Sequence, residues 1–210
     1  LPMPADICSV IMAAGASSRM PPEMRPKACC KVGPVSVIEN TLRTFEHAGV
    51  TRHLVVVGHQ AERVMTEVSA RRKDVLFAFQ PEPKGTGDAV RCALTLLGAA
   101  EPPEHVLICA GDKVIAPHVL RGLIETCAVR NEDLSLVAGS SAHHPSAGRI
   151  ILREDRPVAI LETADIRVRQ MTGVLRGLTP GQCPRTVGDL QSFAARYAKP
   201  KHIAAQAPAL

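Results

Sequence analysis

Short apolar runs alternate with amphipathic segments along the first two-thirds of the chain. The runs that predict β-strands are Ile7 to Met12, His53 to Val57, Val75 to Phe79, His105 to Cys109, and Leu134 to Ala138. Their hydrophobicity is continuous rather than alternating, which is typical of strands buried on both faces. The periodicity of the intervening segments predicts helices at Val35 to Ala48, Ala61 to Ala70, Asp88 to Leu97, and His118 to Val129. This alternation predicts an α/β fold, a doubly wound and mostly parallel sheet with helices on both faces.

The first predicted helix carries its own start signal. Ser36 and Glu39 have the S-x-x-E spacing of a capping box, in which the serine hydroxyl accepts a hydrogen bond from a backbone N–H of the first turn. Ile38, Leu42 and Phe45 follow at helical spacing. We expect these side chains to form the buried stripe of the helix.

The pattern changes after Gly148. Two strand-like runs, Arg149 to Leu152 and Val158 to Leu161, flank a polar turn. They predict a β-hairpin, near residues 148–162, that is added to the main sheet.

These patterns also predict the domain organisation. We expect residues 1–173 to form one domain that contains the sheet and the hairpin. Residues 174–210 are rich in Arg, Pro, Gly and Ala, and they predict a helical or irregular extension with one helix at Val187 to Ala198. One interpretation is that this extension is the start of a further part of a longer protein.

Composition narrows the class of protein and of ligand. Of the 210 residues, 46% are hydrophobic, 21% are charged and only 2% are aromatic, so we expect a soluble globular protein with an aliphatic core. The net charge of +5 suits anionic ligands. Because the cations are scattered without interleaved aromatic residues, we expect no nucleic-acid partner. The one tight basic run, Arg71-Arg72-Lys73, is interpreted as the solvated end of a helix.

The seven cysteines include neither a C-x-x-C pair nor a spacing suited to zinc, which favours reduced thiols and a cytoplasmic location. Cys8 and Cys109 lie in predicted strands, where we expect them to pack as small apolar side chains. We expect packing rather than catalysis for Cys29 and Cys30 as well. No apolar run reaches the ~20 residues of a membrane span, so we expect no membrane partner.

The first segment with candidate chemistry runs from Val10 to Met20, where an apolar run breaks into small residues and ends near Arg19. Residues with little or no side chain, here Ala13, Ala14 and Gly15, expose backbone groups to a base and to phosphates. Arg19 and Lys27 supply positive charge. The alternative is an ordinary buried strand and loop with two unrelated cations.

A second segment, Gln80 to Val90, follows a predicted strand and opens a helix. Its Gly85 and Thr86 therefore stand where backbone groups can meet a ligand. The amide of Gln80 offers both a donor and an acceptor, as reading the edge of a base requires. The alternative for this segment is a tight turn followed by a helix cap.

A third segment, Val106 to Asp112, is a predicted strand that ends in a carboxylate. Ligands bind beyond the carboxyl ends of the strands in a doubly wound sheet, so we expect Asp112 to meet the two preceding segments there. Magnesium prefers oxygen ligands, which makes Asp112 a candidate for Mg²⁺. The alternative for Asp112 is a helix cap. In the hairpin, Gly148 could let a ligand approach the backbone, and Glu162 could accept hydrogen bonds from sugar hydroxyls. The alternative is that both are ordinary hairpin residues.

In this order the segments resemble the sugar-1-phosphate nucleotidyltransferases, and most closely the uridylyltransferase domain of the bacterial N-acetylglucosamine-1-phosphate uridylyltransferases. The resemblance spans roughly residues 6 to 165 and implies the Rossmann-like nucleotidyltransferase fold. It implies a nucleotide-binding set of Ala13, Ala14, Gly15, Gln80, Gly85 and Thr86. It also implies phosphate-binding and catalytic cations at Arg19 and Lys27, a magnesium ligand at Asp112, and amino-sugar contacts at Gly148 and Glu162.

The reaction implied by the resemblance joins a nucleoside triphosphate, with UTP favoured, to a sugar 1-phosphate, with N-acetylglucosamine 1-phosphate favoured. A phosphate oxygen of the sugar attacks the α-phosphorus in line and pyrophosphate leaves, so no protein nucleophile is needed. The implied cofactor is Mg²⁺. The sequence leaves the oligomeric state open, a homo-oligomer included.

The chain departs from the family pattern after the third segment. Lys113-Val114-Ile115 follows Asp112, where the family has a small residue, a proline and an apolar residue. Met171-Thr172-Gly173 stands nearest to the family's Asn-Thr-Gly, and no match to the segment with a second magnesium ligand exists between Val174 and Leu210. The chain is then either the front part of a longer enzyme or a non-catalytic nucleotide-binding domain.

A related enzyme class also stays open. The run from Ala13 to Met20 also resembles the cytidylyl- and guanylyltransferases that act on the molybdenum cofactor. The Gln80 to Val90 segment and the hairpin favour the sugar enzymes.

Overall fold

A computed structural model describes residues 6–17, 20–24, 26–99, 101–130, 133–139, 148–154 and 156–161. The chain divides into two compact units, with the boundary between Val137 and Ala138. Each unit is described by itself. The predicted domain boundary between residues 173 and 174 lies outside the described residues and stays a prediction.

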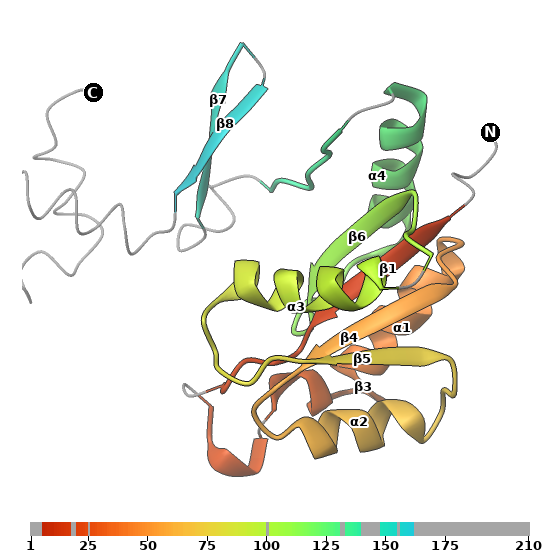
Figure 1. Ribbon diagram of the computed structural model, residues 1–210, viewed down its shortest axis with the longest axis vertical. Helices are drawn as coiled ribbons and strands as arrows, with labels where there is room; N and C mark the ends of the chain where they lie inside the picture. The colour runs from red at the N-terminus through yellow and green to blue at the C-terminus, as the bar shows by residue number, and fades with distance from the viewer. Residues whose placement is uncertain are drawn as a thin grey trace, which may run out of the picture. The chain divides into compact units, whose positions relative to one another are not determined.

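The first unit is built on one sheet of parallel strands (Figure 1). The strands are β1 (Ile7–Met12), β4 (Arg52–Val57), β5 (Val75–Phe79) and β6 (His105–Ala110), in the spatial order β5-β4-β1-β6. The chain moves outward from β1 through β4 to β5 and then returns to add β6 on the other side of β1. The topological switch point therefore lies between β1 and β6. The predicted α/β class and parallel sheet are confirmed.

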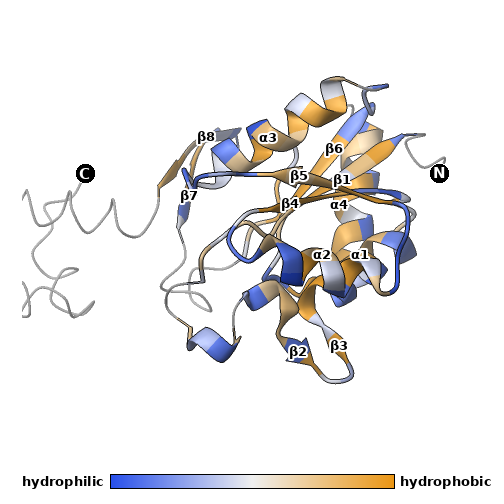
Figure 2. Cartoon of the chain, turned by 60° about the horizontal axis from the view of Figure 1, so that its bottom comes forward, coloured by the Kyte–Doolittle hydropathy of each residue, from blue (hydrophilic) through white to orange (hydrophobic). Residues whose placement is uncertain are grey.

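Helices cover both faces of this sheet. They are α1 (Val37–His47), α2 (Ala61–Ser69), α3 (Thr86–Gly98) and α4 (Pro117–Arg130). One core cluster joins alternate strand residues such as Ile11 and Val55 to apolar residues of α1, α2 and α4. The other cluster joins Val10 and Leu54 to α3. Figure 2 shows why the layers form, since the strands are largely apolar whereas the helices mix apolar and polar residues.

The start of α1 forms as its sequence predicts. Ser36 is the N-cap, and its hydroxyl accepts a hydrogen bond from the Glu39 backbone N–H at 3.4 Å. Ile38, Leu42 and Phe45 are fully buried. The predicted buried stripe is therefore confirmed.

Short elements lie between β1 and α1. They are the 3-10 helices η1 (Pro22–Met24) and η2 (Lys27–Cys29) and an antiparallel pair formed by β2 (Lys31–Val32) and β3 (Val35–Ser36). Gly33 allows the tight turn between these strands because its φ is +66°. Sequence periodicity did not predict this small pair, since each strand has two residues.

The described part of the second unit is the predicted hairpin. β7 (Arg149–Arg153) pairs with β8 (Arg156–Leu161) in an antiparallel two-stranded sheet, with an irregularity between Ile151 and Leu152. The hairpin is thus confirmed. Its predicted addition to the main sheet is wrong, because among the described strands β7 and β8 hydrogen-bond only to each other.

One predicted strand is wrong. Residues 134–138 form no strand, and Leu134, Leu136 and Val137 are exposed by 67%, 41% and 56%. An apolar run forms a strand only where a neighbouring strand takes up its hydrogen bonds, and no described strand pairs with this one. The predicted helix at Val187 to Ala198 lies outside the described residues.

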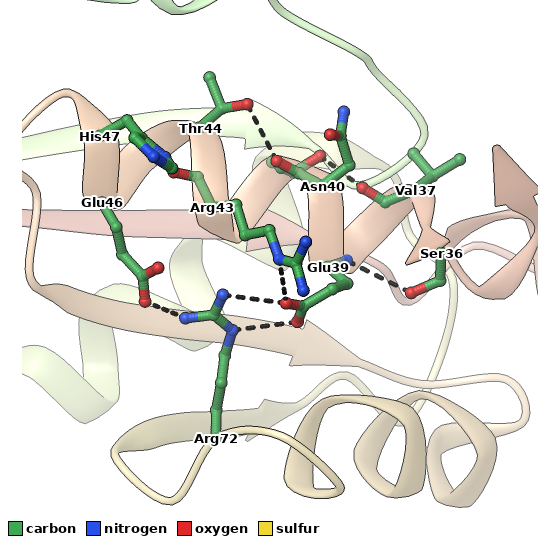
Figure 3. A network of polar contacts seen from close by, with 10 residues as sticks. Ser36, Val37, Glu39, Asn40, Arg43, Thr44, Glu46, His47 and Arg72 are labelled. Atoms are coloured by element: carbon green, nitrogen blue, oxygen red, sulfur yellow. Dashed lines mark hydrogen bonds and ion pairs between the residues drawn. The ribbon is translucent and has the colours of Figure 1, made fainter. Parts of the chain in front are cut away.

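The interpretation of the basic run as a solvated helix end is wrong for Arg72, whose side chain is only 10% exposed. Figure 3 shows its guanidinium between two carboxylates of α1. It bonds Glu39 at 3.1 and 3.2 Å and also pairs with Glu46, while Arg43 bonds Glu39 at 2.7 Å. The run follows α2, and Arg72 ties the end of that helix to α1, because a carboxylate as buried as Glu39 needs partners.

Candidate functional site

A cavity of about 440 Å³ opens at the carboxyl ends of β1 and β6, which is the topological switch point. Three segments that are far apart in the sequence line it. They are the loop after β1 with the start of η2, the segment that joins β5 to α3, and the loop after β6. The lining residues are Met12, Ala13, Ala14, Gly15, Ser17, Pro26, Lys27, Ala28, Gln80, Pro83, Gly85, Thr86, Ala89, Ala110, Gly111 and Asp112.

The floor of the cavity is backbone that continues the parallel sheet. The Ala13 N–H donates to the Val56 carbonyl at 2.8 Å, and the Gly111 N–H donates to the Met12 carbonyl at 2.8 Å. A Cβ on Gly111 would lie 2.9 Å from that Met12 oxygen, so only glycine permits this approach. A Cβ on Gly15 would meet nothing within 4 Å, because Gly15 borders open space.

One side of the cavity carries the charged groups. Lys27, the first residue of η2, places its Nζ 3.6 Å from Oδ2 of Asp112, which follows β6. Their side chains are 32% and 40% exposed. The Ser17 hydroxyl accepts a hydrogen bond from the Lys27 backbone N–H at 3.2 Å, and Ser17 itself has a left-handed φ of +50°. The loop after β1 is thereby fastened to the lysine.

A buried threonine holds the loop that carries the aspartate. The Thr41 hydroxyl, in α1, lies 2.9 Å from the Val37 carbonyl oxygen and 3.0 Å from the Lys113 carbonyl oxygen, so its single proton serves both. Thr41 is only 2% exposed. This contact fastens the residue after Asp112 to the helix layer.

The other side of the cavity is built around Gln80, which is 5% exposed. Its Nε2 donates to the Gly85 carbonyl at 3.2 Å and to Oδ2 of Asp88 at 2.8 Å. Asp88 also accepts from Arg91 at 2.5 Å. Gly85 has a φ of +103°, a conformation that side chains rarely adopt, and it is the N-cap of α3. The hydrogen bonds from Gln80 and then Arg91 lower the pKa of Asp88.

The donor set at Asp112 suits a hard cation that also binds substrate phosphates. Within the described part of the chain, no group of three or more His, Cys, Asp or Glu side chains could enclose a metal ion. Mg²⁺ does not need such a cage, since it commonly takes one or two carboxylates together with phosphate oxygens. The exposed carboxylate of Asp112 in the cavity wall fits that mode.

Two cysteines near the cavity, Cys29 and Cys109, have no features of nucleophiles. Burial, and then the charge of Asp112, raises the pKa of Cys109 to about 11. Burial, and then the charge of Glu67, raises the pKa of Cys29 to about 11. A thiol needs its thiolate form to attack, so both thiols are inert near neutral pH. Cys8 is also buried in its strand, as predicted.

The structure brings most of the predicted site residues to this one cavity. They are Ala13, Ala14, Gly15, Lys27, Gln80, Gly85, Thr86 and Asp112. Arg19 and Glu162 lie outside the described residues, and Gly148 precedes β7 in the second unit. The roles assigned to all of these residues stay predictions.

Sequence reasoning assigned no role to Thr41 or Asp88. Thr41 sits mid-helix at an apolar-facing position, and nothing in its spacing reveals the Lys113 carbonyl that it meets. Asp88 stands in the segment after Gln80, but its contact depends on the turn made by Gly85. Sequence offered one signal for Asp88, which is an acidic residue in the first turn of a helix.

Among the described helices, none combines the length and the apolar character needed to cross a membrane.

Comparison with known proteins supports the fold and the family. The sequence model of one protein family, the MobA-like NTP transferase domain, matches residues 9–178. The bifunctional protein GlmU of Chromohalobacter salexigens is 37% identical over 158 residues, which are 74% of this chain and 33% of that protein. GlmU of Mycobacterium marinum is 29% identical over 197 residues, which are 91% of this chain and 39% of that protein. The chain thus spans about a third of the length of these relatives.

A solved structure shares the fold. A Bacillus anthracis protein, described as a glucose-1-phosphate thymidylyltransferase in complex with a sucrose, superposes with a TM-score of 0.55. The match covers 74% of this chain and 64% of that chain at 18% identity. The family match over residues 9–178 and the GlmU relatives confirm the resemblance to nucleotidyltransferases inferred from the sequence.

Proposed function

This chain belongs to the family of MobA-like NTP transferase domains, and on that premise we propose that it transfers a nucleotidyl group from a nucleoside triphosphate to a sugar 1-phosphate, with release of pyrophosphate. UTP is the proposed donor and N-acetylglucosamine 1-phosphate the proposed acceptor. Mg²⁺ is the proposed cofactor. The GlmU relatives support the choice of sugar enzymes over other members of the family.

The single observation that carries the proposal is the convergence of three distant segments on one cavity at the switch point. One wall holds the nearly buried amide of Gln80 beside Gly85, whose φ is positive, and this wall is suited to a base. The other wall is the Lys27 and Asp112 pair, which is suited to phosphates and their counterion. A nucleoside triphosphate has the same division into an apolar, hydrogen-bonding end and a charged end.

In the proposed reaction, an oxygen of the sugar phosphate forms a bond to the α-phosphorus of the triphosphate. The bond from that phosphorus to the bridging oxygen breaks, and its electron pair leaves with pyrophosphate. Both reactants are polyanions, so the rate enhancement comes from positioning them and from neutralising their charge. Lys27 offers a cation to the phosphates, while Gln80 and the start of α3 hold the base.

Asp112 would hold the Mg²⁺ ion, which supplies charge compensation at phosphate oxygens when it is bound. By the family resemblance, Arg19 would add a second phosphate-binding cation. Gly148 and Glu162 would contact the amino sugar.

The test is a pyrophosphate-release assay on the purified chain with Mg²⁺. Each of UTP, CTP, GTP and ATP is combined with N-acetylglucosamine 1-phosphate or glucose 1-phosphate, and mass spectrometry identifies the nucleotide sugar. We expect the highest rate with UTP and N-acetylglucosamine 1-phosphate. The matched control omits the sugar phosphate, which should abolish release.

The second candidate is a cytidylyl- or guanylyltransferase of the molybdenum cofactor, which the MobA-like family model favours. A thermal-shift panel separates the two, because ligands that bind only the folded state stabilise it. Stabilisation by CTP or GTP but not by UTP would replace the first proposal with this one. Stabilisation by a nucleotide without any pyrophosphate release would indicate a non-catalytic binding domain.

A further inference from the structure

The amide of Gln80 has a fixed orientation. An amide nitrogen donates hydrogen bonds and an amide oxygen accepts them. The two groups nearest to one end of this amide are the Asp88 carboxylate at 2.8 Å and the Gly85 carbonyl at 3.2 Å. Both can only accept, so the nitrogen must face them, and both of its hydrogens are used there.

The oxygen of Gln80 is left for the cavity. Gln80 lines the cavity with only 5% of its surface exposed, and no described residue donates a hydrogen bond to Oε1. Among the described residues, Oε1 is not one of the buried polar atoms that lack a partner, so it faces the open space of the cavity, where an N–H of a ligand can pair with it.

We propose that Asp88 is a positioning residue that sets the base preference of the site by holding Gln80 as an acceptor. This inference rests on the proposed function, because it takes the cavity to be the nucleoside triphosphate site. Asp88 is not among the residues that line the cavity, so it is not placed to contact a base bound there. It acts through Gln80, because without the Asp88 carboxylate only the Gly85 carbonyl, at 3.2 Å, still favours this orientation of the amide.

The ionised state of Asp88 is essential to this role. A protonated carboxyl or an amide at this position could donate a hydrogen bond to the Gln80 oxygen, and the reversed Gln80 amide would then fit as well. Hydrogen bonds from Gln80 and then from Arg91 lower the pKa of Asp88, which keeps it an acceptor near neutral pH. Arg91 approaches Asp88 from the solvent side, with its side chain 73% exposed.

An acceptor at this point selects one class of pyrimidine. The ring N3 of uracil carries a hydrogen next to a carbonyl, whereas the ring N3 of cytosine is a bare acceptor. The first backbone N–H groups of α3 lie beside Gln80 and can donate to that carbonyl. In the same pose cytosine would oppose its N3 to the Gln80 oxygen. The site therefore favours uracil over cytosine.

The test is the ratio of the dissociation constants for UTP and CTP, measured by calorimetry. The ratio cancels the contribution of the triphosphate, which the two nucleotides share. Asp88→Asn has the same shape but can donate or accept, so it removes the stronger of the two contacts that fix the Gln80 amide and leaves only the Gly85 carbonyl to oppose its reversal. We expect the wild-type chain to prefer UTP by about tenfold or more, and Asp88→Asn to reduce that preference by about tenfold, the effect of one buried hydrogen bond.

Glu82→Gln is the matched control. It makes the same carboxylate-to-amide change in the same segment, where Glu82, within the described part of the chain, pairs only with Lys84 at the surface. Its UTP to CTP ratio should equal that of the wild-type chain. Circular dichroism checks the fold of each variant, and Asp88→Ala replaces Asp88→Asn if the latter does not fold.

Two outcomes overturn the proposal while leaving the proposed function intact. One is an equal loss of affinity for UTP and CTP in Asp88→Asn, which indicates a structural role only. The other is a wild-type chain that binds CTP as tightly as UTP. A chain that binds neither nucleotide overturns both proposals, whereas binding with the expected ratios but no pyrophosphate release overturns only the proposed function.

Discussion

Two ion-pair systems in the first unit use similar groups in opposite ways. The Glu39 carboxylate is 3% exposed and receives hydrogen bonds from Arg43 at 2.7 Å and from Arg72 at 3.1 and 3.2 Å. The Asp112 carboxylate is 40% exposed and, among the described residues, pairs only with the Lys27 ammonium, at 3.6 Å. The first system is saturated by its protein partners, and the second is not.

This difference separates a structural pair from a pair that can exchange partners. A buried carboxylate loses its hydration, and only several strong hydrogen bonds offset the free energy lost with it. Removal of one partner therefore destabilises the fold strongly. A half-exposed pair keeps much of its hydration and contributes little to stability. Lys27 and Asp112 can therefore give up each other for a phosphate and a metal ion at small cost to the fold.

The largest expected effect comes from the exchangeable pair. Lys27→Met should lower the kcat/KM of the proposed reaction by about 10²–10³, because a cation aimed at the reacting phosphates is lost. The free energy of unfolding should change by less than about 0.5 kcal/mol. Pyrophosphate release and urea unfolding measure the two quantities.

Lys31→Met is the control for this prediction, since Lys31 is an exposed lysine of β2 that does not line the cavity. It should change neither quantity. An unchanged kcat/KM in Lys27→Met would remove Lys27 from the mechanism.

The buried pair should show the reverse pattern. Glu39→Gln removes the charge that Arg72 and Arg43 face, and we expect it to lower the free energy of unfolding by about 3 kcal/mol. The kcat/KM of the protein that remains folded should not change. Glu46→Gln, at a carboxylate that is 41% exposed, should lower the free energy of unfolding by less than about 1 kcal/mol in the same urea titration. Equal losses in the two variants would contradict the comparison.

The smallest expected effect is in the pH dependence of stability, with two contributions. Burial lowers the pKa of His53 below its ordinary 6.5, against a weaker opposing effect of Asp74. The unfolded state therefore binds a proton first as the pH falls below about 6.5, and stability decreases there by at most about 1.4 kcal/mol per pH unit.

Glu39 contributes at lower pH. Burial would raise its pKa, but hydrogen bonds from Arg72 and then Arg43 outweigh burial and lower the pKa below 4.5. Its stabilisation is complete above about pH 4.5 and is lost as the pH falls further. Urea unfolding from pH 7 to about pH 3 should show both losses. His53→Gln should remove only the upper one, and Glu39→Gln only the lower; a single loss that neither variant alters would contradict this assignment.

Continuous apolar runs predicted the sheet well, because burial on both faces leaves a direct mark on the sequence. β1 and β5 have the predicted bounds, and β4 and β6 differ from them by one residue. The same signal failed at Leu134, where the run has no partner strand among the described residues. Hydrophobicity reports the tendency to be buried, whereas a strand also needs a neighbour.

The cavity lining was predictable for a related reason. Parallel strands direct their carboxyl ends to one edge, so the segments after β1, β5 and β6 had to meet. The contacts that hold those segments were not predictable. Arg72 finds Glu39 across 33 positions, and Thr41 finds Lys113 across 72. Such pairings depend on how the layers stack, which no local pattern in the sequence records.

The place of Asp88 has a consequence for how a site of this kind evolves. Under the proposed function, residues in the cavity lining contribute to packing and also bind the base or the phosphates, so a substitution among them disturbs several tasks. Asp88 lies in the first turn of α3, outside the lining, and contributes to it only by accepting the hydrogen bond from the Gln80 amide. A single substitution there could change which nucleotide is chosen while the lining stays intact. Lineages that exchange one nucleotide for another would then have a short path, one mutation long, that begins outside the cavity.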